Sequence, residues 1–213
     1  MKKVNTRSLV LLGMLTAVEL LFLLTPIGTI PIGNLSITLG VIPVALAAVA
    51  LGPVGGAAMG AIFGILSFLQ CFGIGVLSPM GAVLVDINPV LAFLQRFVPR
   101  TLDGFLLGYI YKLVSKLHPD VAFPVTGFFS AFLNTVFFMS ALVLCFGKTD
   151  YVQGLMGGKA VLAYIVGSIG VNAVCEMIAS TVITGAVGAA LYHAGLLPSS
   201  RAARSKPAET AET

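Results

Sequence analysis

Long apolar stretches dominate this chain, and short segments rich in proline, glycine and polar residues separate them. A helix of roughly 20 apolar residues spans the hydrocarbon core of a bilayer. Proline cannot continue a helix, so the breaks between stretches are expected where proline and glycine gather. The pattern predicts six membrane helices. Their expected ranges are 6–24, 39–51, 55–72, 98–117, 121–146 and 159–193.

The segments between these helices differ in composition. Residues 26–38 are rich in proline, glycine and β-branched residues, which indicates a loop with some extended structure. Residues 73–97 are expected to form a long outer loop with a short helix near 90–97. Residues 147–158 are expected to form a polar, glycine-rich loop. Residues 1–195 thus form one membrane domain, and the polar residues 196–213 a disordered cytoplasmic tail.

The composition supports a membrane protein. The chain has 213 residues, of which 58% are hydrophobic and 9% are charged, whereas ordinary globular domains carry about 25% charged residues. A soluble domain of this size has too few polar residues to cover so much apolar side chain. This excludes a soluble enzyme, a nucleic-acid-binding protein and a disordered chain, and it makes the lipid bilayer the first expected partner.

The basic residues predict the orientation. With six helices both ends lie on one side, and that side carries the larger group of basic residues: Lys2, Lys3, Arg7, Lys112, Lys116, Arg201, Arg204 and Lys206. The opposite side carries Arg96, Arg100, Lys148 and Lys159. Cytoplasmic loops of membrane proteins carry the excess of Lys and Arg. The expected protein is an all-α, multi-pass protein of the cell membrane with both termini in the cytoplasm.

Motifs for catalysis are absent from the sequence. No GxxxxGK[ST] phosphate-binding loop occurs, since Gln153 stands where the first glycine before Gly158-Lys159 would be. The two histidines, His118 and His193, are far apart in the chain, and the three cysteines lie in apolar runs without a CxxC pair. We therefore expect neither an enzyme nor a cofactor or metal site, and a protein without a phosphate-binding loop is not expected to hydrolyse ATP by itself.

Small residues recur at helical spacing in two places. Gly52, Gly56, Gly60 and Gly64 are four residues apart and share one helix face, which favours close helix packing in lipid. Gly13 and Ala17 form a second small face on the first helix. From the residues alone, this second face either packs within the protein or binds another membrane protein.

Polar residues inside the apolar stretches are candidates for function, because a charge at the centre of a membrane helix costs about 2.5–3.5 kcal/mol on insertion scales. Asn172 and Glu176 are four residues apart and share a helix face. Asp103 either forms an ion pair with Arg100 or serves a site. Glu19 lies near the outer boundary, where it is either solvated or functional. The sequence leaves these alternatives open.

These groups gather towards the outer half of the predicted bundle and predict a pocket open to the outside, with apolar walls and few polar groups. Arginine binds carboxylates through two parallel hydrogen bonds, so an anionic or amide-bearing small solute suits the set. The predicted substrate-binding residues are Asn34, Asn88, Arg96, Arg100, Asn134, Asn172 and Glu176.

Several segments, in this order and spacing, resemble the substrate-binding S component of an energy-coupling factor (ECF) vitamin transporter. They are the run IPVALAAVALGPVGGAAMGAIFGILSF at 42–68, VPRTLDGFLLGYIYKLV at 98–114, LNTVFF at 133–138, and the Asn172-x-x-x-Glu176 pair. The loop TPIGTIPIGNLSIT at 25–38 also fits. The resemblance covers about residues 6–193.

The resemblance implies six helices, cytoplasmic termini, and a vitamin bound near the outer face. It also implies docking onto a transmembrane coupling subunit with two ATPases. Family members show an Ala-x-x-x-Ala pair on the first helix that contacts the coupling subunit, and the matching residues here are Gly13 and Ala17. The pantothenate-specific branch is the most similar. The alternatives are a folate or riboflavin S component, or a stand-alone proton-coupled transporter.

Overall fold

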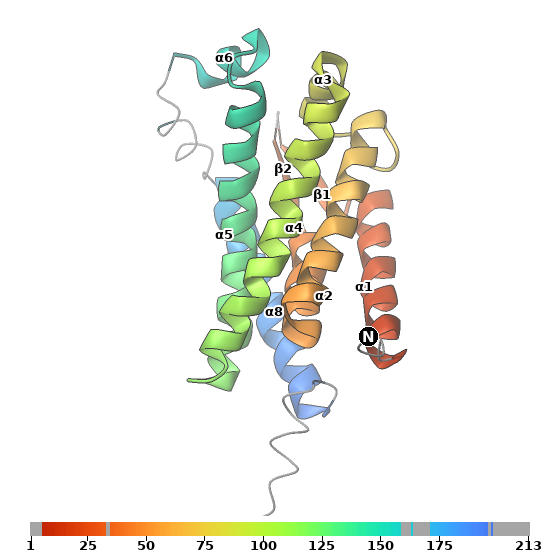
Figure 1. Cartoon of the computed structure of the whole chain (residues 1–213), viewed down its shortest axis with the longest axis vertical. Coiled ribbons are helices and arrows are strands. Elements are labelled where there is room, and N and C mark those ends of the chain that lie inside the picture. The colour runs from red at the N-terminus through yellow and green to blue at the C-terminus, as the bar shows by residue number, and fades with distance from the viewer. Residues whose placement is uncertain (1–5, 33–34, 159–162, 164–170, 196, 198–213) are drawn as a thin grey trace, which may run out of the picture.

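The computed structural model describes residues 6–32, 35–158, 163, 171–195 and 197. These residues form a bundle of helices with a small β-hairpin (Figure 1). The helices are α1 (Thr6–Leu24), α2 (Val41–Leu69), α3 (Pro79–Ile87), α4 (Pro89–Val114), α5 (Pro119–Phe146), α6 (Asp150–Met156) and α8 (Val171–His193); a 3₁₀ turn, η1 (Gln70–Phe72), follows α2, and the strands are β1 (Thr29–Ile32) and β2 (Leu35–Thr38).

Helix α2 folds back on itself at Gly52. This glycine has φ 75° and ψ −166° inside the helix, a conformation that L residues rarely adopt. A Cβ at Gly56 would lie 2.9 Å from the Cβ of Ala48, although residues eight apart in a straight helix are separated by about 12 Å. The two arms therefore run antiparallel, as the descending and ascending ribbons of Figure 1 show. The predicted break between residues 51 and 55 is confirmed.

The second arm of α2 packs directly against the backbone of α4, and these two helices form the most extensive helix pair among the described residues. A Cβ at Gly56 would overlap the carbonyl oxygen of Gly104, and a Cβ at Gly60 would overlap that of Arg100. A Cβ at Gly64 would lie 2.8 Å from the Cα of Phe97. The glycine spacing thus produces the close helix contact that the sequence predicts.

Helices α5 and α8 meet in a similar way. A Cβ at Gly127 would overlap the carbonyl oxygen of Ser180. The hydroxyl groups of Ser130 and Ser180 lie 2.9 Å apart and share a hydrogen bond across the interface. Small residues and interhelical hydrogen bonds are the means by which helices associate in lipid, where no hydrophobic effect drives them together.

The segment before α2 contains the expected extended structure. Strands β1 and β2 pair antiparallel, with Thr29 opposite Thr38. The amide of Leu39 donates to the carbonyl of Gly28 at 2.9 Å and closes the base of the hairpin. Helix α8 packs against β2, so the hairpin is held by the last helix as well as by its own ladder.

The expectation of a long loop over residues 73–97 is wrong. Only residues 73–78 separate η1 from α3, and α4 begins at Pro89, nine residues before its predicted start. The side chain of Ser78 accepts from the amide of Gly81 and caps α3, which starts at Pro79. Asn88 and Pro89 start α4 in the same way. Proline at the first helical position starts a helix, so these prolines mark beginnings and not breaks.

The remaining helices follow the prediction to different degrees. Helix α1 has the predicted bounds, and α5 begins two residues earlier than predicted. The predicted loop 147–158 contains the short helix α6. Of the predicted helix 159–193, the structure describes residue 163 and residues 171–193, all helical. The tail 196–213 lies outside the described residues except for Leu197, which is buried.

Among the described residues, three helices are long and apolar enough to cross a membrane: Val41–Phe72, Asp120–Phe146 and Ala173–His193, with Ser8–Leu24 as a shorter apolar helix. The first of them folds back at Gly52. Helix α4 is of similar length but carries three charged residues along its buried face. The first residue of α1 and the last of α8 lie at the same end of the bundle (Figure 1). Six spans and cytoplasmic termini stay predictions.

Replacing Gly60 by alanine should destabilise the fold. The added methyl group would overlap the Arg100 carbonyl, and overpacking of this kind costs about 1–3 kcal/mol. We expect the melting temperature of the detergent-solubilised protein to fall by several degrees. Gly154→Ala in α6, where a Cβ meets nothing within 4 Å, is the matched control and should not lower it. Equal melting temperatures for the two variants would show that the contact is not tight.

Candidate functional site

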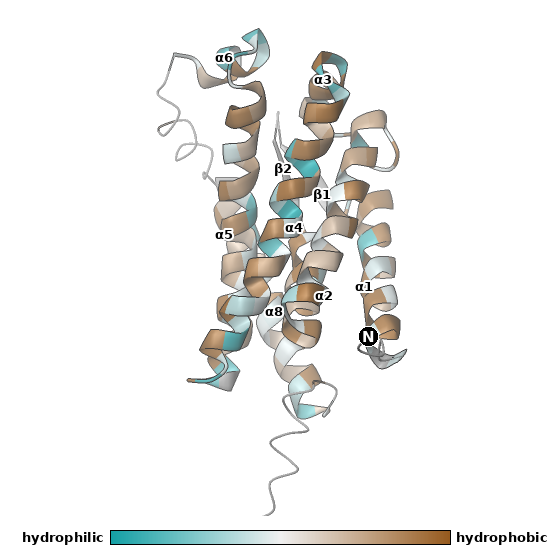
Figure 2. Ribbon diagram, in the orientation of Figure 1, coloured by the Kyte–Doolittle hydropathy of each residue, from teal (hydrophilic) through white to brown (hydrophobic). Residues whose placement is uncertain are grey.

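Polar side chains are buried at mid-height in the bundle. Hydrophilic bands interrupt the hydrophobic ribbon part-way along α4 and α1 (Figure 2). The ionisable members of this polar cluster are all at most 5% exposed: Glu19, Arg96, Arg100, Asp103 and Glu176. They come from three helices, α1, α4 and α8, that converge on the same interior region.

Arg96 is held by two serines from different segments. Its Nη1 donates to the hydroxyl of Ser67 at 2.9 Å and to the carbonyl of Ser67 at 3.4 Å. Its Nη2 donates to the hydroxyl of Ser78 at 2.9 Å. The Nε atom is buried and has no hydrogen-bond partner. Arg96 therefore joins α4, α2 and the start of α3, and keeps one donor available.

Arg100 lies one turn further along α4, within cation–π distance of two aromatic rings. Its guanidinium carbon is 4.5 Å from the ring centroid of Phe63 and 5.1 Å from that of Phe138. The ring of Phe138 also lies 5.5 Å from the guanidinium carbon of Arg96. Aromatic faces attract guanidinium groups and replace part of their lost hydration. The Nη1 of Arg100 donates to the Arg96 carbonyl at 3.1 Å, while its Nε has no partner.

Three carboxyl groups surround Arg100 without contacting it. Glu19, Asp103 and Glu176 all interact with it electrostatically. Of the two alternatives that the sequence left for Asp103, the ion pair with Arg100 does not form in the described structure, where the Oδ1 atom of Asp103 has no partner. The two arginines and three carboxyl groups thus form a loosely paired cluster, with donors and acceptors still unused.

Glu176 fixes the β-hairpin to α8. Its Oε1 atom accepts a hydrogen bond from the backbone amide of Thr38 at 2.5 Å. Thr38 is the last residue of β2, and its hydroxyl accepts from the amide of Gly40 at 3.3 Å. A residue of the last helix therefore holds the segment that leads into α2.

Two buried amide side chains also lack partners. The Oδ1 atom of Asn134 is unpaired, and both polar atoms of Gln95 are unpaired although Gln95 is 0% exposed. Asn134 lies one turn before Phe138 on α5 and so faces the same interior region. Buried polar groups without partners are rare in proteins. Their concentration around α4 indicates a site that a ligand or water completes.

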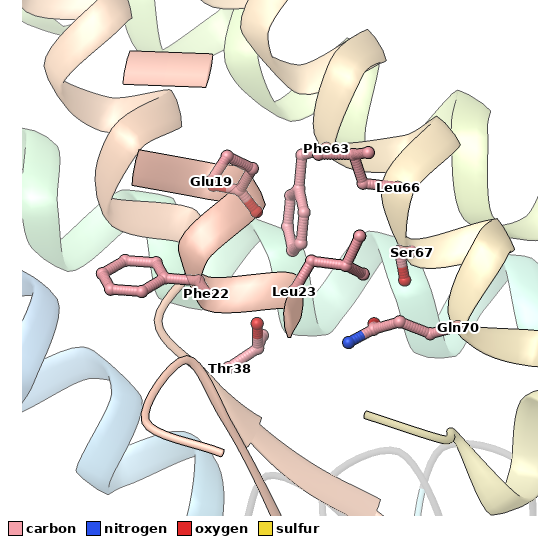
Figure 3. Close-up of a pocket in the computed structure, with 8 residues that line it drawn as sticks. All are labelled: Glu19, Phe22, Leu23, Thr38, Phe63, Leu66, Ser67 and Gln70. Carbon is pink, nitrogen blue, oxygen red and sulfur yellow. The ribbon is translucent and has the colours of Figure 1, made fainter. Parts of the chain in front are cut away.

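A pocket lies beside the arginines. It is lined by residues of α1, β2, α2 and η1: Glu19, Phe22, Leu23, Thr38, Phe63, Leu66, Ser67 and Gln70 (Figure 3). About 200 Å³ of empty space lies within it, a volume that includes space open to solvent. Ser67 binds Arg96 and Phe63 stacks on Arg100, so both arginines adjoin its wall.

The predicted site residues divide into two groups. Arg96, Arg100, Asn134 and Glu176 lie in or next to the polar cluster. Asn88 lies apart from it and caps α4, with its Oδ1 accepting from the amides of Val90 and Leu91. Asn34 and the side chain of Asn172 lie outside the described part of the chain.

The sequence analysis missed four residues that build the site: Ser67, Gln70, Phe63 and Phe138. Ser67 and Gln70 are polar residues within an apolar run, the same signal that singled out Glu19 and Asn134. For the two phenylalanines no sequence signal exists, because fourteen phenylalanines are present and only the fold shows which ones stack on arginine.

The two small residues of α1 lie on its exposed side. A Cβ at Gly13 would meet nothing within 4 Å, and Ala17 is exposed. The opposite side of α1 carries Thr16, Glu19 and Leu23, which face the rest of the protein. The described structure thus favours an outward face over internal packing for Gly13 and Ala17.

No set of three or more His, Cys, Asp or Glu side chains within the described ranges could hold a metal ion. The sequence model for the family of ECF transporter substrate-specific components matches residues 7–188. This match covers most of the chain, which therefore belongs to that family; it is a family of transporter subunits and not of enzymes. No curated protein sequence matches the chain.

Removing the Glu176 carboxyl group should loosen the hairpin. We expect Glu176→Ala to speed hydrogen–deuterium exchange at the Thr38 amide, because its acceptor is lost. Glu176→Gln retains an acceptor oxygen and should preserve most of the protection. Ile178→Ala, at an exposed position of α8, is the control and should leave exchange unchanged. Equal exchange in wild type and Glu176→Ala would contradict the observed hydrogen bond.

Proposed function

We propose that this protein is the vitamin-binding subunit of an ECF-type importer and that it captures a small anionic B-vitamin, with pantothenate favoured. The observation that carries the proposal is the pair of buried arginines beside the pocket. Arg96 and Arg100 each keep an unpaired Nε donor, and charge-assisted hydrogen bonds from arginine to carboxylate are among the strongest in proteins.

The chemistry of the site favours a small solute that carries both a carboxylate and an amide. A carboxylate offers acceptors to the arginine donors. The unpaired amide groups of Gln95 and Asn134 supply both donors and acceptors, which match an amide bond in the solute. Pantothenate has both groups, and its flexible, non-aromatic skeleton does not require stacking on a tryptophan, a residue that this chain lacks.

The position of the pocket supports capture from the outer face. Leu23 lies in the last turn of α1 and Gln70 follows the last residue of α2. The pocket therefore lies between mid-height and the end of the bundle that is opposite the first residue of α1 (Figure 1). With both termini in the cytoplasm, as the basic residues predict, this end faces outwards. Asn88, which caps the first turn of α4, stays a candidate for solute contact, as do Asn34 and Asn172 from the sequence.

Energy for import would come from partners. We propose that the exposed Gly13–Ala17 face of α1 docks onto a transmembrane coupling subunit that carries two ATPases. A face of small residues lets a second helix approach closely, and the absence of a phosphate-binding loop from this chain agrees with ATP hydrolysis by another subunit. Docking would then carry the occupied site towards the cytoplasm.

Two alternative functions can be distinguished from the proposed one by vitamin-binding and vesicle-uptake measurements. A folate or riboflavin S component would bind its own vitamin from the same panel in preference to pantothenate. A stand-alone proton-coupled transporter is suggested by the buried carboxyl groups. It would accumulate solute in vesicles along a pH gradient without any partner subunit, whereas the proposed subunit would not.

Substitution of Arg100 should weaken solute binding. Pantothenate is expected to raise the melting temperature of the wild-type protein. Loss of a hydrogen bond to a charged group costs about 1.5–3 kcal/mol, so Arg100→Gln should bind at least about tenfold more weakly. Lys112→Gln, which removes an exposed charge from the same helix, is the matched control. A vitamin response that is the same in both variants would remove Arg100 from the site.

A bulky residue on the small face of α1 should block transport but not binding. We expect Gly13→Leu or Ala17→Leu to abolish uptake in cells that contain the complete transporter, while the purified variants keep wild-type vitamin affinity. Met14→Leu conserves size at the neighbouring exposed position and should transport normally. Reduced vitamin affinity in Gly13→Leu would instead place this residue in the internal packing.

A further inference from the structure

Glu19 lies in the wall of the pocket, on the inner side of α1, and nothing above gives it a role. Its side chain is 3% exposed and its Oε2 atom has no hydrogen-bond partner. We propose that Glu19 accepts a hydrogen bond from a hydroxyl or ammonium group of the solute, so that the transported acid also carries such a donor. This inference rests on the proposed function and specifies the substrate class further.

The pocket is arranged around this carboxyl group. Figure 3 shows the Glu19 carboxyl group beside the ring of Phe63. A Cβ at Gly40 would lie 2.5 Å from Glu19 Oε1 and 2.6 Å from Phe63 Cε2. The carboxyl group and the ring therefore occupy this space together only because residue 40 has no side chain. A side chain that served only to face lipid or solvent would not need such an opening in the neighbouring segment.

A purely structural role as counterion to Arg100 does not account for Glu19. The two groups interact electrostatically, but no ion pair joins them in the described part of the chain, and the guanidinium group contacts the rings of Phe63 and Phe138. An acceptor that is buried without a hydrogen-bond partner destabilises the protein. A donor from the solute would satisfy it when the pocket is occupied.

The other polar groups of the pocket restrict what the solute can present there. The Ser67 hydroxyl accepts from Arg96, and the Thr38 hydroxyl accepts from the amide of Gly40. Glu19 Oε2 is an acceptor that these contacts leave unused. A hydroxyl or an ammonium group fits, with the acid group of the solute directed towards the arginines.

The experiment compares solutes that differ in one group. Binding of pantothenate, and of analogues in which each hydroxyl is replaced by hydrogen, is measured by calorimetry on wild type, Glu19→Leu and Glu19→Gln. Leucine fills similar space without an acceptor, while glutamine retains an acceptor oxygen without the charge. Thr16→Val, on the same face of α1 with its hydroxyl bonded to the Leu12 carbonyl, is the matched control.

We expect wild type and Thr16→Val to bind the parent at least about tenfold more tightly than one of the deoxy analogues. Glu19→Leu should bind the parent and that analogue with nearly equal affinity. The preference of Glu19→Gln for the parent should lie between those of wild type and Glu19→Leu. Apo melting temperatures verify that the variants fold. A preference for the parent that persists unchanged in Glu19→Leu overturns the inference while leaving the proposed function intact.

If pantothenate does not bind, the same comparison is made with the small molecule that copurifies with wild type, identified by mass spectrometry. A copurifying acid that carries no hydroxyl or amino group overturns the inference alone. If no molecule copurifies and no vitamin in the panel binds, both the proposed function and the inference are contradicted. Loss of the copurifying molecule from Glu19→Leu but not from Thr16→Val would support the role proposed for Glu19.

Discussion

The direct backbone contact between the second arm of α2 and α4 determines where everything else in this bundle lies. Gly56 and Gly60 leave no room for a side chain against the carbonyl groups of Gly104 and Arg100. The turn at Gly52 brings the first arm of α2 back beside the second. Because this contact fixes the position of α4 along α2, it also fixes the positions of Arg96 and Arg100 relative to Ser67 and Phe63.

The two arginines can be buried because neighbouring side chains replace most of the hydrogen bonds and electrostatic stabilisation that water would supply. Serines bind Arg96, and the rings of Phe63 and Phe138 lie against the Arg100 guanidinium group. The replacement is incomplete, since the Nε atoms and several acceptors around them stay unpaired. A cluster that served only stability would gain from exchanging such groups for apolar ones. The unpaired donors and acceptors suit the binding of a polar solute, as proposed for this cluster.

The sequence predicted those structural features that depend on local residue patterns. The spacing of the glycines anticipated the helix contact, the Gly52-Pro53 break is present, and the search for polar residues within apolar runs singled out Asn134 and Glu176, which are buried. The error over residues 73–97 arose because Pro79 and Pro89 were read as breaks, although Ser78 and Asn88 before them are helix caps. The stacking of Phe63 and Phe138 on arginine depends on tertiary packing, which no local pattern encodes.

Helix α1 links the two activities proposed for this protein. Its outward side carries Gly13 and Ala17, and its inward side carries Glu19 in the pocket wall, less than two turns from Ala17. It packs mainly against α2, so it is less firmly tied to the bundle than α4. A partner that displaced α1 on docking would move Glu19 relative to Arg100 and change the affinity for the solute. By thermodynamic linkage, bound solute must then change the affinity for the partner by the same factor. Binding of solute in the pocket would therefore alter docking at the Gly13–Ala17 face through the movement of α1 alone.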